Sequence, residues 1–211
     1  MDDPCMSGRT GAGTFLWMWA VMMIPMMLPS LVPALSRYRR AVGDTGDAHL
    51  GRLTAIVATA YFVVWVAFGL IVFPVGVALA TVAMQRPALA RAVPMAAAVV
   101  VLLAGALQFT AWKAHQLACC RESPARALPP DNVTAWRHGL RLGFHCSICT
   151  AGLTAILLVL GVMDPRVMAA VTVAVTAERL ARNGELVARA IGVIVVGVGL
   201  LLMARAAGFV R

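Results

Sequence analysis

The sequence has few charged residues for its length. Asp, Glu, Lys and Arg make up 13% of its 211 residues, whereas a soluble globular domain typically has about a quarter. Hydrophobic residues reach 61%. This balance excludes an ordinary soluble domain, and it predicts a protein that crosses a membrane several times.

Acidic residues are scarcer than basic ones. The chain has 9 Asp and Glu against 18 Lys and Arg, an excess that could attract nucleic acid. These basic residues lie in short segments between long apolar runs, where Lys and Arg orient a protein in the bilayer. We therefore expect no nucleic-acid partner. The segments richer in Lys and Arg include the one that carries most of the cysteines, so this face is predicted to be cytoplasmic.

Several motifs of enzymes and secreted proteins are absent. The sequence contains no phosphate-binding glycine loop, no nucleophile elbow and no zinc-protease helix. It also shows no cleavable signal peptide, and a disulfide framework is not expected in a bundle of spanning helices. We predict no catalytic residues and no cofactor-binding residues, and our leading interpretation is not an enzyme.

The apolar runs predict an all-α fold, a polytopic transmembrane helical bundle of about six spans. At ~1.5 Å of rise per residue, a helix over the fifth run is short compared with a hydrocarbon core of about 30 Å. The bundle has five spans if this helix does not cross the membrane. With six spans both termini face outward. We expect a tail over 1–14 and one helical domain over 15–211, with a Cys- and His-bearing loop at 113–141. The predicted spans are 15–35, 53–84, 92–112, 142–163, 166–180 and 186–203. In the last of them, we expect Gly192, Gly197 and Gly199 to permit close helix contact rather than to bind a ligand.

Local signals set two of the helix starts. Asp131 or Asn132 can cap a helix that leads into the fourth span, and Asp164 followed by Pro165 is typical of a helix start. Counted from the turn at Asp164, Cys149 and Glu178 lie at nearly equal distances along two successive helices. We therefore expect these two residues to lie level.

A C-x-x-C pair begins the apolar part of the fourth span. Cys146 and Cys149 follow His145 directly, and two thiols at this spacing can bind a soft metal together or form a redox-active disulfide. Neutral His and thiolate Cys suit zinc, copper or iron, and ligand sets rich in thiolate favour the softer ions. Ordinary buried thiols are the remaining interpretation.

Other candidate ligands lie on the same predicted face. Cys119 and Cys120 follow the third span, and Glu178 is expected at the depth of the C-x-x-C pair. An acidic group at the membrane edge can act as a ligand or proton acceptor. The other interpretation is an ion pair at a helix end that faces water, since Arg179 follows Glu178 directly.

The first span is rich in methionine. Met22, Met23, Met26 and Met27 form helical rows that could pass Cu(I) between soft ligands. Methionine also fills irregular gaps, and the three prolines of this span would leave such gaps. Both interpretations stay open.

Four stretches of the chain carry a resemblance to a known family. They are Trp19–Ser30, Lys113 with Leu117, Cys120, Arg121 and Pro124, His145–Cys149, and Gly161–Met163 through Met168 to Glu178 and Arg179. In these stretches the chain resembles a bacterial family of predicted metal-binding integral membrane proteins, a domain of unknown function. The resemblance implies metal binding in a bacterial inner membrane, although Gln116 and Thr150 stand where the family pattern has cysteines.

These observations predict a membrane protein that binds copper first and zinc second, for metal handling or transport. Its expected partners are the metal ion, the lipid bilayer, and other membrane proteins or further copies of itself. One alternative is a thiol-disulfide oxidoreductase coupled to quinone. Another is a structural subunit of a membrane complex.

Overall fold

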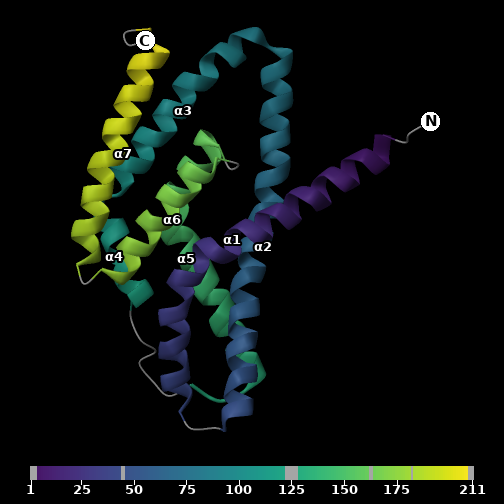
Figure 1. Cartoon of the computed structure of the whole chain (residues 1–211), viewed down its shortest axis with the longest axis vertical. Coiled ribbons are helices and arrows are strands. Elements are labelled where there is room, and N and C mark those ends of the chain that lie inside the picture. Colours follow the sequence, from purple (N-terminus) through teal and green to yellow (C-terminus); the bar gives the residue numbers. More distant parts are fainter. Residues whose placement is uncertain (1–3, 44–45, 122–127, 162–163, 182, 209–211) are drawn as a thin grey trace. The chain divides into compact units, whose positions relative to one another are not determined.

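All regular secondary structure in the described part of the chain is α-helical. The computed structural model describes residues 4–43, 46–121, 128–161, 164–181 and 183–208, without the side chains of 4–12, 83, 87–90, 120 and 121. The predicted all-α class is confirmed. The helices, shown in Figure 1, are α1 (Pro4–Val42), α2 (Asp47–Gln85), α3 (Pro87–Leu107), α4 (Ala111–Arg121), α5 (Asn132–Leu160), α6 (Pro165–Leu180) and α7 (Gly184–Ala206).

The helices form two compact units. Unit 1 comprises Met1–Val82 with Pro124–Phe144, and unit 2 comprises Ala83–Ser123 with His145–Arg211. The C-x-x-C pair therefore belongs to unit 2, together with α4, α6 and α7. The methionine-rich helix α1 belongs to unit 1.

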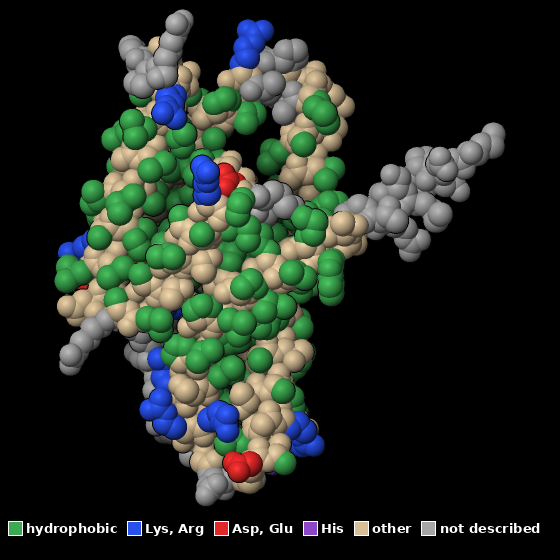
Figure 2. Space-filling model, in the orientation of Figure 1, with side chains coloured by type: hydrophobic (Ala, Val, Ile, Leu, Met, Phe, Trp, Pro, Cys, Tyr) green, Lys and Arg blue, Asp and Glu red, His purple; other side chains and the backbone are tan. Residues whose placement is uncertain are grey.

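Among the described residues, four helices are long and apolar enough to cross a membrane, judged by length and composition. They are α1 from Gly13, α2 to Val82, α5 and α7. A fifth candidate is the bent pair formed by α3 and α4, whose axes differ by 67°. Helix α6 has 16 residues, too few for a hydrocarbon core of about 30 Å, so six spans are not confirmed. Figure 2 shows apolar side chains over the outward faces of the helices, with Lys and Arg near helix ends.

Both predicted helix starts are confirmed. Asp131 caps α5, since its carboxylate accepts a hydrogen bond from the Thr134 backbone N–H at 2.9 Å. Hydrogen bonds from Thr134 hold the pKa of Asp131 below its usual value, so this contribution to stability is present above the unfolded pKa and is lost as the pH falls through the folded one. Asp164 caps α6 through the Arg166 N–H at 2.8 Å, with Pro165 in the first turn.

Unit 1 is held together by close contacts with α2. The Trp19 indole N–H of α1 donates to the Trp65 carbonyl at 3.0 Å, and Trp19 lies over Gly69, where a Cβ would be 2.6 Å from its ring. Gly139 of α5 lies against the Val57 backbone, and Gly143 lies against the Tyr61 backbone. Glycines at this spacing let two helices approach more closely than larger side chains would allow.

Unit 2 contains an antiparallel pair, α3 and α7, which lie side by side in Figure 1. Gly105 contacts Val196, Gly192 contacts Gln108, and Gly199 contacts Leu102. The sequence suggested that Gly192, Gly197 and Gly199 permit close helix contact. This holds for Gly192 and Gly199, whereas Gly197 faces open space, with nothing within 4 Å of an added Cβ.

This difference makes Gly197 and Gly199 a matched pair for a stability test. In Gly199→Ala the new methyl group would lie 2.8 Å from the Leu102 side chain and 3.1 Å from its backbone nitrogen. We expect a loss of about 1 kcal/mol in unfolding free energy, because crowding exceeds the gain in helix propensity. Gly197→Ala should instead stabilise the helix by up to ~1 kcal/mol. Denaturant titration in detergent measures both, and equal effects would contradict the close α3–α7 contact.

Candidate metal-binding site

Cys146 and Cys149 lie on one side of α5. Residues three apart in an α-helix are surface neighbours, and both cysteine side chains are buried. Cys149 packs against Leu117 of α4 and Ala188 of α7. The helix therefore presents the C-x-x-C pair to the interior of unit 2 rather than to its surface.

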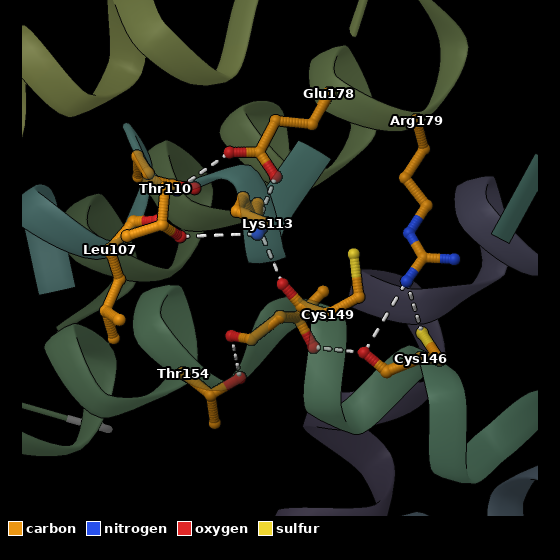
Figure 3. A network of polar contacts seen from close by, with 10 residues as sticks. Leu107, Thr110, Lys113, Cys146, Cys149, Thr154, Glu178 and Arg179 are labelled. Carbon is orange, nitrogen blue, oxygen red and sulfur yellow. Dashed lines mark hydrogen bonds and ion pairs between the residues drawn. The ribbon is translucent and has the colours of Figure 1, made fainter. Parts of the chain in front are cut away.

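The break between α3 and α4 brings a lysine to this pair. Thr110 lies in the break, and its hydroxyl oxygen accepts the Lys113 backbone N–H at 3.3 Å, at the start of α4. The Lys113 ammonium group then reaches α5, where it donates to the Cys149 carbonyl at 2.7 Å. Figure 3 shows this contact at the centre of a polar network. A helix that simply continued α3 would carry Lys113 elsewhere.

Glu178 of α6 completes a buried ion pair with the same lysine. The Lys113 Nζ lies 2.8 Å from the Glu178 Oε2, and the two side chains are only 5% and 1% exposed. The other carboxylate oxygen accepts the Gln108 amide N–H at 2.8 Å. Because Lys113 binds both Glu178 and the Cys149 carbonyl, the prediction that Cys149 and Glu178 lie level is confirmed. Glu178 pairs with Lys113 of another helix, away from water.

Arg179 of α6 contacts the other cysteine. Its Nη2 lies 3.1 Å from the Cys146 Sγ and 3.5 Å from the Cys146 carbonyl oxygen. The same carbonyl accepts the Thr150 hydroxyl at 2.9 Å. A guanidinium beside a sulfur stabilises the thiolate, which is the form that acts as a metal ligand. Figure 3 shows Arg179 and Glu178 on the α6 side of the two cysteines.

The predicted ligands do not all meet at one point. No group of three or more His, Cys, Asp or Glu side chains placed to hold a metal occurs among the described residues. Cys119 is half-buried, with its sulfur 3.6 Å from the His115 Nε2 on its own helix. His145 is half-buried on α5. The Cys120 side chain lies outside the described residues.

The candidate methionines lie in the other unit. Met22, Met23, Met26 and Met27 are all buried within α1, which belongs to unit 1. Their burial is what packing requires of methionine. It is also compatible with a soft ligand row, so the transfer hypothesis for this helix stays a prediction.

Sequence reasoning did not place Gln108, Lys113 or Arg179 beside the two cysteines. Lys113 and Arg179 were part of the family resemblance, but no spacing rule links them to cysteines more than thirty residues away. The available signal was a single lysine directly after an apolar run, where a charge must find a partner or reach water.

A comparison with protein families identifies the class of this protein. A family model described as PpoB2, copper chaperone, matches residues 16–202. The chain belongs to the PpoB2 copper chaperone family. No curated protein and no solved structure matches it.

Membership in the PpoB2 family makes copper handling the function at a coarse level. The matched range includes all the candidate ligands named above, and the expectation of a metal-related family is confirmed. Among the metals considered, the family description names copper. The structure brings five residues of the PpoB2 match into one network of polar contacts. They are Cys146, Cys149, Lys113, Glu178 and Arg179.

Proposed function

We propose that this protein is a membrane copper chaperone that binds Cu(I) through the thiolates of Cys146 and Cys149. The observation that carries the proposal is the Arg179 guanidinium at 3.1 Å from the Cys146 sulfur. Cysteines that only fill a core need no cation beside them. A cation beside a thiol favours the thiolate, and thiolates prefer soft ions such as Cu(I).

The surrounding network supports a preorganised site. Lys113 holds the Cys149 carbonyl, while Gln108 and Glu178 fix the position of Lys113. Partners that orient metal ligands raise metal affinity, because less order must be gained on binding. Both carboxylate oxygens of Glu178 accept bonds from the protein, so we assign Glu178 to this support of the thiols.

We propose Cys120 as a third ligand on the basis of helix register. Successive residues of an α-helix turn by about 100°, so a residue seven positions after Lys113 returns to within about 20° of the same face. Lys113 and Leu117 already contact the C-x-x-C segment from this helix. Cys119, by contrast, lies about 120° around the helix and contacts His115.

Copper binding by purified protein tests the proposal. Protein prepared in detergent without a His-tag, under reducing and anaerobic conditions, should hold about one Cu(I) per chain, in competition with a chromogenic Cu(I) chelator. The Cys146→Ser, Cys149→Ser double variant should hold less than about a tenth of an equivalent, because serine is a poor ligand for soft ions. Equal copper in this variant and the wild type would end the proposal.

Two adjacent cysteines provide a matched control for the third ligand. Cys120→Ser should lower Cu(I) affinity by about tenfold or more, because two-coordinate binding would replace three-coordinate binding. Cys119→Ser should leave the affinity within about threefold of the wild type, because its register turns it away from Lys113. The reverse order of effects would assign the third position to Cys119 instead.

A further inference from the structure

The guanidinium group of Arg179 lies where it would interact electrostatically with a metal bound to the Cys146 thiolate. Its guanidinium approaches the sulfur of Cys146 directly, at 3.1 Å, and Figure 3 shows it on the α6 side of both cysteines. Lys113 and Glu178 form a pair of opposite charge close by. The guanidinium is in direct contact with the Cys146 sulfur, so its charge acts on the sulfur ligands at short range.

The charge of the bound complex depends on the metal. When two thiols bind Cu(I) and release two protons to solvent, the complex carries a charge of −1. With a divalent ion such as Zn(II), the same ligands give a neutral complex. A third thiolate makes both complexes more negative by the same amount, so the monovalent complex is always the more negative by one.

A fixed cation therefore affects the two complexes differently. Arginine keeps its charge under all ordinary conditions, and its attraction to a bound complex grows with the negative charge of that complex. The interior of unit 2 screens this attraction less than water would, because Cys146 and Cys149 are buried. The cation stabilises the Cu(I) complex relative to the Zn(II) complex.

We propose that Arg179 is a specificity-determining residue that favours monovalent soft ions, Cu(I) and Ag(I), over divalent Zn(II). This inference rests on the proposed function, since it takes Cys146 and Cys149 as ligands. It adds that the choice of ion is set by a charge outside the ligand set. Ligand type alone does not provide this choice, because thiolates bind zinc as well as copper.

A purely structural role for Arg179 predicts a different outcome. The guanidinium also lies 3.5 Å from the Cys146 carbonyl oxygen, so its loss could loosen the end of α6 against α5. Such loosening would weaken the binding of every ion to a similar extent. The ratio of Cu(I) to Zn(II) affinity separates the two roles, because it cancels effects that are common to both ions.

The test measures this ratio in full-length protein in detergent. Dissociation constants for Cu(I), Ag(I) and Zn(II) are determined by chelator competition in wild type, Arg179→Gln and Arg179→Lys. In Arg179→Gln the ratio of Cu(I) to Zn(II) affinity should fall by about tenfold, with Ag(I) following Cu(I). Arg179→Lys keeps the charge and should keep the ratio within about threefold. Arg189→Gln is the control, because Arg189 forms an exposed pair with Glu185 on α7.

The possible outcomes are distinct. An unchanged ratio in Arg179→Gln, or an equal fall in Arg179→Lys and Arg179→Gln, would overturn the proposed role of charge. If the Cys146→Ser, Cys149→Ser double variant binds Cu(I) as the wild type does, the proposed function fails first and this inference fails with it. Retained Cu(I) binding by wild type with an unchanged ratio in Arg179→Gln would overturn this inference alone.

Discussion

Replacing Lys113 with methionine should lower the free energy of unfolding by about 3–5 kcal/mol. The substitution leaves the Glu178 carboxylate buried without its cation, since the Lys113 and Glu178 side chains are 5% and 1% exposed and their charged atoms lie 2.8 Å apart. It also removes the hydrogen bond to the Cys149 carbonyl. Denaturant titration in detergent measures the stability, and copper affinity should fall in the same variant because α4 no longer holds the C-x-x-C segment.

A double variant distinguishes the loss of charge balance from the loss of packing. Lys113→Met combined with Glu178→Met removes both charges, and it should be more stable than either single variant because no buried charge remains unpaired. Arg189→Met is the matched surface control. It breaks a pair whose side chains are 55% exposed, and exposed pairs contribute only about 0–1 kcal/mol. A loss below about 1 kcal/mol in Lys113→Met would contradict the importance of the buried pair.

The helix boundaries around the site could be predicted from local sequence. Asp164 and Pro165 start α6 as expected, because an acidic cap followed by proline satisfies the first turn of a helix without reference to the rest of the chain. The level placement of Cys149 and Glu178 followed from the same turn, since helix rise is constant. These features depend on neighbours in sequence alone.

The partners of the thiols could not be predicted in the same way. Lys113 was expected in a loop, but residues 108–110 interrupt the helix and redirect it, so that α4 carries the lysine towards α5. This redirection depends on tertiary packing. The position of the third thiol is known less closely for a different reason. The Cys120 side chain lies outside the described residues, so this cysteine is placed only by its register on α4.

The number of spans illustrates the limit of counting apolar residues. Helix α6 was the weakest of the predicted spans, and it carries Glu178 and Arg179 into the network with α4 and α5. Charged side chains are costly inside a hydrocarbon core unless they have partners in the protein, and the two of α6 contact Lys113 and the Cys146 sulfur. The same helix supplies the residue that we propose to set metal specificity.

Close helix contact is the other feature that sequence reasoning located only in part. The glycines of α7 were recognised, whereas Gly139 and Gly143 of α5 lie four apart in the sequence and were not. Gly139 lies in the helix that was expected to lead into the fourth span, and Gly143 lies at the start of that span, but the sequence does not show which helix would lie against them. In the structure they bring α5 against the backbone of α2 within unit 1, in the segment directly before the C-x-x-C pair.

Gly139→Ala should therefore destabilise the protein by about 2–3 kcal/mol. An added Cβ would lie 2.5 Å from the Val57 carbonyl oxygen and 2.7 Å from the Ala60 Cβ. Backbone atoms of a helix cannot move aside as a flexible side chain can, so α5 must shift away from α2. The expected loss exceeds that of Gly199→Ala, in which the nearest atoms belong to the Leu102 side chain.

Gly152→Ala on the same helix is the matched control. Its new methyl group would lie 3.6 Å from the Ala104 carbonyl oxygen, an ordinary contact distance, so the variant should be neutral or up to ~1 kcal/mol more stable through better helix propensity. Both variants are compared by denaturant titration in detergent. Equal stability of the two would show that α5 does not press against α2 at Gly139.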